Sequence, residues 1–200
     1  MYHLPRIVVL FLVIWAGLAA ETAPGVLARV SAAAQSVQAL RIPFVQIKHL
    51  AMLDEPLETQ GVMEIDRKRG ALRWEFTGQA VLVMLDGRLR RWGADGREDR
   101  LDQDPSAQSM AGQMRGMLKG EWDGLKEIFE VSENDLAWQV VFKPKTKEMG
   151  RFVESLAMTF RENGAPKHLL LLSPGGDRTE YRFAEPDALY VPDPVRFTQP

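Results

Sequence analysis

The sequence predicts a mainly β protein with a few helices, an α+β fold built on one antiparallel sheet. Apolar and polar residues alternate with a period of two through most of residues 42–184, as they do in strands that bury one face. Turn residues such as Asp86 and Gly87, or Asn163 and Gly164, separate these runs. Most of the gaps are too short for a helical crossover, so we expect consecutive strands to run antiparallel.

Residues 1–20 have the pattern of a secretory signal peptide. Arg6 precedes an unbroken apolar run over residues 7–15, and the small residues Gly17 and Ala19 follow it. An uncleaved membrane anchor is the alternative, but the run is short for a span of about 20 residues. Residues 21–200 contain no linker or repeat that would divide them, so we expect them to form a single domain.

The composition excludes several classes of protein. The 200 residues include 25 Lys plus Arg and 27 Asp plus Glu, a net charge of −2, which gives no general attraction for nucleic acid. The chain has no cysteine, which excludes disulfides, thiolate metal sites and a cysteine nucleophile. A secreted protein without cysteines suits the Gram-negative periplasm, where free thiols are oxidised.

The first predicted element after the signal peptide is a helix over residues 24–40. Leu27, Val30, Ala34 and Val37 recur close to the helical period of 3.6, and this stripe must cover an apolar surface. The alternating pattern then predicts ten strands, over residues 42–50, 57–66, 71–77, 79–86, 88–93, 97–102, 136–143, 153–162, 167–173 and 178–184.

A helical stretch over residues 105–128 interrupts the strands. It carries Met110, Met114 and Met117 at helical spacing, and a second short helix is predicted at 122–128. Two interpretations of the methionine stripe remain open, since flexible methionines can fill a core or line a cavity for apolar ligands. The tail, residues 186–200, contains four prolines and is predicted to be extended.

One face of the predicted sheet is apolar and the other is polar. On residues 71–77, Leu72, Trp74 and Phe76 point one way, whereas Arg73 and Glu75 point the other. A sheet of about ten strands curls, and its concave face needs helices or a ligand to cover it. The few predicted helices give little cover, so we expect space to remain on the apolar face.

The residues of an enzyme active site are missing from the sequence. His49 and His168 have no partner at metal-ligand spacing, and no pair of carboxylates stands out as a general acid and base. There is no Gly-x-Ser-x-Gly motif and no phosphate-binding loop. We therefore expect a protein that is not an enzyme and that uses no metal and no cofactor.

A basic run follows the second strand, with Arg67, Lys68 and Arg69 in a turn and Arg73 just beyond. One interpretation is a solvated turn between charged strand faces. The other places these side chains at the rim of a cavity, where they could meet an anionic headgroup or an acidic partner.

Four segments, in this order after an N-terminal helix, carry a resemblance to a known family: FVQIK at 44–48, ETQGVM at 58–63, LRWEF at 72–76 and LDGRL at 85–89. The chain resembles the periplasmic outer-membrane lipoprotein carrier family, called LolA-like, over most of residues 21–200. The resemblance implies a strongly curved antiparallel half-barrel, that is, an incomplete β-barrel whose open side is covered by a lid of helices. We expect the protein to be a monomer.

The resemblance also implies a function. LolA-like carriers take the acyl chains of lipoproteins at the inner membrane, shield them in an apolar cavity and deliver them to the outer membrane. The expected partners are acyl chains of lipoproteins or lipids, an inner-membrane exporter and an outer-membrane acceptor, without nucleic acid. One alternative is a carrier of a free lipid, glycolipid or polyene product that works with an envelope exporter. A second is an envelope stress sensor or protein-interaction module on the same fold.

Candidate site residues follow from the apolar face and from the resemblance. The family has an arginine six residues before the strand tryptophan that governs the closed and open states. Counting back from Trp74 gives Lys68, with Arg67 just upstream, so these two are the candidate rim or switch residues. The candidates for the cavity lining are Met63, Leu72, Trp74, Phe76, Met110, Met114, Met117, Trp138, Phe142, Met158 and Phe160.

Overall fold

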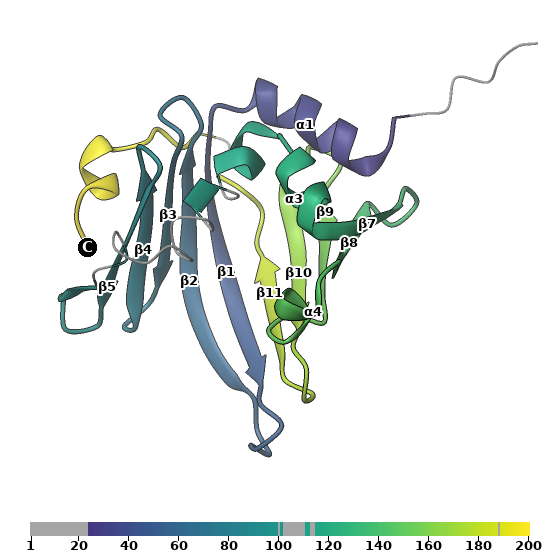
Figure 1. Cartoon of the computed structure of the whole chain (residues 1–200). Helices are drawn as coiled ribbons and strands as arrows, with labels where there is room; N and C mark the ends of the chain where they lie inside the picture. The colour runs from purple at the N-terminus through teal and green to yellow at the C-terminus, as the bar shows by residue number, and fades with distance from the viewer. Residues whose placement is uncertain (1–23, 100, 102–110, 113–114, 188) are drawn as a thin grey trace, which may run out of the picture.

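The computed structural model describes residues 24–99, 101, 111–112, 115–187 and 189–200. Within them, one curved 11-stranded antiparallel sheet carries helices across its open side (Figure 1). The predicted α+β half-barrel is therefore confirmed. The predicted signal peptide, residues 1–20, lies outside the described residues.

The sheet consists of two antiparallel wings that join at its centre. Its first wing contains β1 (Ala39–His49), β2 (Leu57–Asp66), β3 (Ala71–Phe76), β4 (Ala80–Leu85), β5 (Arg88–Gly93) and β6 (Glu98–Asp99). Its second wing contains β7 (Phe129–Asn134), β8 (Gln139–Pro144), β9 (Ser155–Phe160), β10 (Pro166–Leu172) and β11 (Arg178–Phe183). Pairing of β1 with β11 joins the wings, so β6 and β7 form the two free edges.

The N-terminal helix and the helical segment between β6 and β7 lie where the sheet is open (Figure 1). The described helices are α1 (Val26–Ser36), α3 (Asp123–Ile128), α4 (Lys147–Gly150) and the 3₁₀ helix η2 (Pro194–Phe197), and residues 115–119 are also helical. The segment that contains residues 115–119 and α3 connects β6 to β7, the two edges of the sheet. α1 and α3 lie side by side over the same end of the strands (Figure 1). Together with the helical residues 115–119, they form what we call the lid. In the described part of the chain, no helix has the length and apolar character needed to cross a membrane.

The N-terminal helix ends four residues earlier than predicted. It ends at Ser36, and Val37 is already extended, with φ −105° and ψ 107°. The Arg67 amide donates a hydrogen bond to the Gln38 carbonyl at 2.9 Å, which extends the pairing of β1 with β2 backwards into the predicted helix. Leu40 therefore lies in β1 and pairs with Ile65, because the ladder to β2 outcompetes the helical pattern.

The predicted strand at 136–143 begins too early, and the strand before it was missed. Residues 135–138 form the turn between β7 and β8, with Leu136 99% exposed and Trp138 at φ +50°. β7 is an edge strand whose second half, Ser132 to Asn134, is polar and exposed. An edge strand with so few apolar residues lacks the alternation on which the sequence-based prediction relies.

The outer face of the sheet is covered at one place, contrary to the expectation that it is polar throughout. Phe197 of η2 is 1% exposed and packs against Ala71, Val83 and Trp92 on the convex side of β3 to β5. The tail that was predicted to be extended thus ends in a short helix, which begins with Pro194 and is capped by the Asp193 carboxylate.

Candidate functional site

Two apolar clusters line the concave face of the sheet. The first contains the buried residues Leu40, Ile42, Phe44, Met63, Ile65, Leu72, Met84, Leu89, Ala111, Leu118 and Phe183. The second contains Val26, Leu27, Val30, Trp122, Leu125, Phe129, Val140, Phe142, Met158 and Phe160. Leu169 of β10 packs against both, so the two clusters form one continuous apolar surface.

The lid fills the second cluster. Trp122 lies at the start of α3, and its ring stacks on Phe142 at 6.4 Å between centroids and meets the edge of Phe160 at 6.2 Å. Val26 and Leu27 of α1 belong to the same cluster and are buried. Three lining candidates, Phe142, Met158 and Phe160, are therefore in a packed core beneath the helices in this structure.

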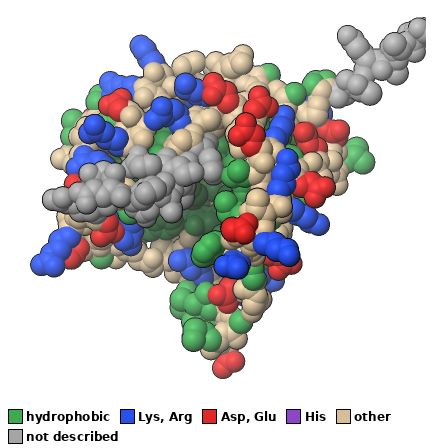
Figure 2. Space-filling view, viewed as in Figure 1, with side chains coloured by type: hydrophobic (Ala, Val, Ile, Leu, Met, Phe, Trp, Pro, Cys, Tyr) green, Lys and Arg blue, Asp and Glu red, His purple; other side chains and the backbone are tan. Residues whose placement is uncertain are grey.

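The first cluster has a partly exposed apolar wall. Trp74, Phe76 and Tyr181 are partly exposed and pack against its buried residues. Trp74 stacks on Phe76 at 5.9 Å and contacts the Tyr181 ring at 5.3 Å. Figure 2 shows a hollow lined with hydrophobic side chains on this face, between the two wings of the sheet. We call this hollow the recess.

A glycine in β2 shapes the same wall. Gly61 pairs with Phe44 on one side and with Phe76 on the other. A Cβ atom at Gly61 would lie 2.3 Å from the Phe44 ring and 2.3 Å from the Glu75 carbonyl oxygen. The absence of a side chain lets the Phe44 ring lie across β2, where it contacts Phe76 at 5.4 Å edge to face.

The remaining lining candidates fall into three groups. Met63 and Leu72 are buried in the first cluster, next to Trp74 in the register of β2 and β3. Met117 and Trp138 are partly buried at the border of the second cluster, and Trp138 lies beneath the Arg29 guanidinium at 4.2 Å. Met110 and Met114 lie outside the described residues.

Arg67 joins two parts of the lid, whereas Lys68 does not. The Nε of Arg67 donates to the Leu118 carbonyl at 3.0 Å, and the Nη1 of Arg67 donates to the Val37 carbonyl at 2.6 Å. These carbonyls belong to the residues following α1 and to the helical segment 115–119. Burial lowers the pKa of the Arg67 guanidinium. Lys68 is exposed and makes no hydrogen bond or ion pair with any described residue.

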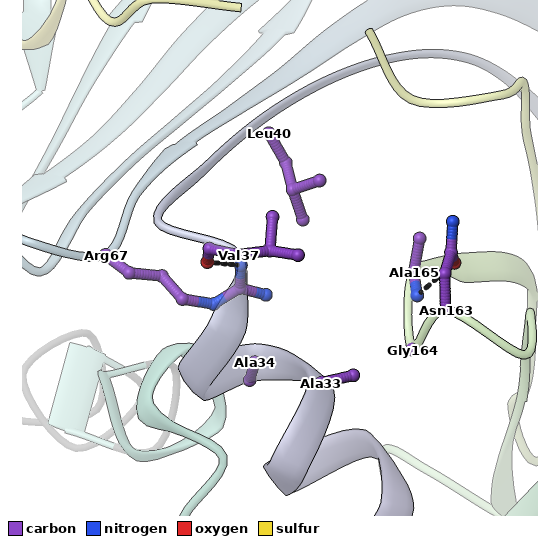
Figure 3. Close-up of a pocket in the computed structure, with 8 residues that line it drawn as sticks. All are labelled: Ala33, Ala34, Val37, Leu40, Arg67, Asn163, Gly164 and Ala165. Carbon is purple, nitrogen blue, oxygen red and sulfur yellow. Dashed lines mark hydrogen bonds between the residues drawn. The ribbon is translucent and has the colours of Figure 1, made fainter. Parts of the chain in front are cut away.

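A small cavity lies beside Arg67 (Figure 3). It measures about 30 Å³ and is lined by Ala33, Ala34, Val37, Leu40, Arg67, Asn163, Gly164 and Ala165. This volume accommodates a water molecule, not an acyl chain. The cavity marks the place where the end of α1 meets the turn between β9 and β10.

Polar contacts that sequence reasoning missed hold α1 in place. The Ser31 hydroxyl lies 2.6 Å from the Gly120 carbonyl oxygen and accepts a hydrogen bond from Trp122 Nε1 at 3.0 Å. At the other end of α1, the Glu133 carboxylate of β7 accepts a hydrogen bond from the Leu27 amide at 3.0 Å. These partners lie 89 to 106 residues apart along the chain, so no local pattern indicates them.

A second, open groove lies on the convex face. It has a volume of about 290 Å³ and is lined by Pro43, Phe44, Val45, Gln60, Gly61, Val62, Thr77, Arg182 and Ala184. Val45, Val62 and Arg182 alternate along their strands with residues that point into the first cluster. This groove is therefore separated from the recess by the sheet.

The two histidines that the structure describes each contact a charged side chain. His168 Nε2 lies 2.9 Å from the Glu180 carboxylate, and His49 Nε2 lies 3.2 Å from the Arg178 guanidinium. Within the residues that the structure describes, no three His, Asp or Glu side chains are grouped closely enough to hold a metal ion.

The curved sheet, the apolar concave face and the helical lid define an open half-barrel. A family model described as outer membrane lipoprotein carrier protein LolA matches residues 35–199, and the chain belongs to this family. The predicted resemblance is thus confirmed. LolA-family proteins are periplasmic carriers of the lipid or lipoprotein type and are generally not enzymes. A search of curated protein sequences gave no match.

Several solved structures are similar to this chain at low sequence identity. A DUF1329 family protein from Desulfovibrio piger is 7% identical, with 86% of this chain and 94% of that chain covered and a TM-score of 0.50. A putative outer membrane lipoprotein-sorting protein domain from Vibrio parahaemolyticus is 13% identical, with 86% and 95% covered and a TM-score of 0.43. The MucA/MucB complex of Pseudomonas aeruginosa is 16% identical over 86% of this chain, with a TM-score of 0.42, and the match spans 59% of that chain.

Proposed function

We propose that the protein is a periplasmic carrier that binds acyl chains of lipoproteins in the recess and transfers them toward the outer membrane. The observation that carries this proposal is the partly exposed aromatic wall of Trp74, Phe76 and Tyr181, which packs against the first cluster on the concave face. Residues 1–20 would direct export as a cleaved signal peptide, and residues 21–200 would form the single carrier domain.

Transfer energies explain why such a carrier is needed. Each buried methylene contributes about 0.8 kcal/mol, so one long acyl chain costs on the order of 10 kcal/mol to expose to water. A recess walled by stacked aromatic rings removes most of this cost during passage through an aqueous compartment. The wall surface that stays partly exposed in this structure is the surface that a chain would cover.

A chain that extends from the recess beneath the helices requires the lid to open, because the lid fills the second cluster. In our proposal Arg67 acts as the latch, because its two hydrogen bonds join the end of α1 to the helical segment 115–119. Counting back from Trp74 favoured Lys68, but Lys68 contacts no described partner. The latch would therefore lie one residue earlier in this chain than the family pattern predicts.

Directional transfer needs other proteins. The sequence contains no nucleotide-binding motif that could drive release, so an inner-membrane exporter would load the carrier and an outer-membrane acceptor would unload it. The acceptor must bind the acyl chains at least as tightly as the recess does, because a ligand moves spontaneously only toward the site of lower free energy.

Native mass spectrometry of protein purified from its own periplasm without detergent tests the proposal. A bound acylated lipoprotein supports it, whereas a bound free lipid favours the alternative carrier that works with an envelope exporter. If the protein is empty and takes up no acyl probe, the carrier function is wrong, and a stable protein complex would then favour the interaction module.

A variant of the wall tests the location of the site. Trp74→Glu puts a charge on the partly exposed apolar wall and is expected to abolish binding of a fluorescent acyl probe, while the protein is still exported and folded. Leu136→Glu is the matched control, since Leu136 is 99% exposed in the turn before β8 and should bind the probe normally. Full binding by the folded Trp74→Glu protein would contradict the proposed site.

A further inference from the structure

One polar pair, with one member buried and the other partly exposed, interrupts the apolar wall of the recess. Gln46 of β1 is 4% exposed, and its Nε2 donates a hydrogen bond to the hydroxyl oxygen of Tyr181 on the neighbouring β11. Burial raises the pKa of the Tyr181 phenol, so the hydroxyl keeps its proton at neutral pH. Since this oxygen accepts from Gln46, its own proton is available for another acceptor.

A second donor lies against the same ring. The Trp74 indole contacts the Tyr181 ring at 5.3 Å between centroids. Its Nε1 is shielded from solvent and makes no hydrogen bond with any described residue. A buried indole N–H normally finds an acceptor, and leaving one unpaired costs about 1–3 kcal/mol. This part of the wall therefore contains two hydrogen-bond donors, the Trp74 indole N–H and the Tyr181 hydroxyl, that have no acceptor among the described residues.

We propose that Gln46, Trp74 and Tyr181 form a polar subsite in the recess that binds a neutral carbonyl group, such as that of an ester-linked or amide-linked acyl chain. The inference rests on the proposed carrier function and adds to it a means of recognising how the chain is linked. The apolar wall would hold the methylenes, whereas the subsite would fix the position of the carbonyl along the wall.

Because the subsite contains no positive charge, it disfavours anionic ligands. Gln46, Trp74 and Tyr181 are uncharged, and no lysine or arginine of the described chain forms a hydrogen bond with any of them. An ionised carboxylate that enters an apolar recess loses its hydration and gains no cation as a partner, so its binding is costly in free energy. A neutral carbonyl costs much less to bury, because the two donors can satisfy it. The proposal therefore separates acylated molecules from free fatty acids.

A matched set of three ligands tests the subsite. Octyl decanoate, N-octyldecanamide and decyl octyl ether have similar length and shape, but only the first two contain a carbonyl. Their affinities can be measured by competition with a fluorescent acyl probe bound to the full mature protein. We expect the ester and the amide to bind about 5–10-fold more tightly than the ether, which corresponds to one or two neutral hydrogen bonds.

Two variants assign this preference to the side chains. Tyr181→Phe and Trp74→Phe each remove one donor and keep an aromatic ring, so each should lower the ratio of ester affinity to ether affinity by about 2–3-fold. Tyr190→Phe and Trp92→Phe are matched controls outside the recess, in the C-terminal tail and on the convex face. Melting temperatures establish that each variant is folded.

The possible outcomes separate the subsite from the carrier function. Equal binding of all three ligands by the wild type, or an undiminished preference in both recess variants, overturns the subsite and leaves the carrier intact. If none of the ligands displaces the probe, or the probe itself does not bind, the carrier function fails and the subsite fails with it.

Discussion

At the scale of single residues, Arg67 joins segments that are distant in the sequence. Its guanidinium donates to the carbonyls of Val37 and Leu118, which lie 30 and 51 residues away. Two hydrogen bonds from one partly buried cation make this side chain a natural point of control over the lid, because both segments would lose a partner together when it moves.

Replacing Arg67 should loosen the lid, and replacing Lys68 should not. Arg67→Ala is expected to lower the free energy of unfolding by about 1–3 kcal/mol, because two carbonyls lose a charged donor. Amide hydrogen exchange should become faster in the last turn of α1 and in residues 115–120. Lys68→Ala, at an exposed position, should change the stability by less than about 0.5 kcal/mol. Unchanged exchange in Arg67→Ala would show that the latch is elsewhere.

At the scale of elements, the position of α1 on the sheet depends on close contact with the turn between β9 and β10. Gly164 has φ +77°, and a Cβ atom there would lie 2.4 Å from the Cβ of Ala33 in α1. The turn therefore requires glycine for two reasons: its left-handed backbone and its contact with the helix. This contact sets how far the end of α1 can approach the strands.

Gly164→Ala should destabilise the protein more than the same change in an open turn. Gly78 has a similar backbone, φ +71°, but a Cβ atom there would have no other atom within 4 Å, so Gly78→Ala carries only the left-handed backbone cost of about 1–2 kcal/mol. The contact with Ala33 should add about 1–3 kcal/mol for Gly164→Ala. Urea unfolding measures the free energy of unfolding of both variants. Equal losses of this free energy would mean that α1 shifts away from the new methyl group without cost.

At the scale of the whole molecule, the C-terminal tail ties the outer face together. Arg196 donates to the Glu64 carboxylate at 2.8 Å, and the buried Arg73 guanidinium donates to the carbonyls of Arg196 and Gln199 at 2.9 and 2.7 Å. Glu64 is 1% exposed, which is tolerated because arginines pair with it. The tail thereby adds a small apolar cluster, around Phe197, to the otherwise polar outer face of the sheet.

Removing the side chain of Phe197 should uncouple stability from ligand binding. Phe197→Ala leaves a cavity against Ala71, Val83 and Trp92 and is expected to cost about 3–5 kcal/mol in unfolding free energy. Affinity for an acyl probe should stay unchanged at temperatures where the variant is folded, because the cluster lies on the convex face. Val195→Ala, 51% exposed in the same helix, should cost less than about 1 kcal/mol. Weaker probe binding in the folded Phe197→Ala protein would contradict this separation of the two faces.

The sequence alone predicted the elements whose pattern is local. β2 and β5 have the predicted bounds, because turn residues adjoin both ends and apolar residues alternate between them. The end of α1 and the whole of β7 were predicted wrongly, because the ladder to β2 and the polar edge position outweigh the local pattern. The inward face of β3, with Leu72, Trp74 and Phe76, could likewise be predicted from alternation.

Periodicity and turn chemistry are local properties, so they were sufficient to predict a curved antiparallel sheet with an apolar inner face and a helical cover. Which part of that face is filled depends on tertiary contacts that no local pattern contains. Trp122 of the lid packs on Phe142 and Phe160, whereas Trp74 and Tyr181 stay partly exposed. The docking position of the lid helices follows from contacts such as those of Ser31 and Arg67, which join residues far apart in the chain.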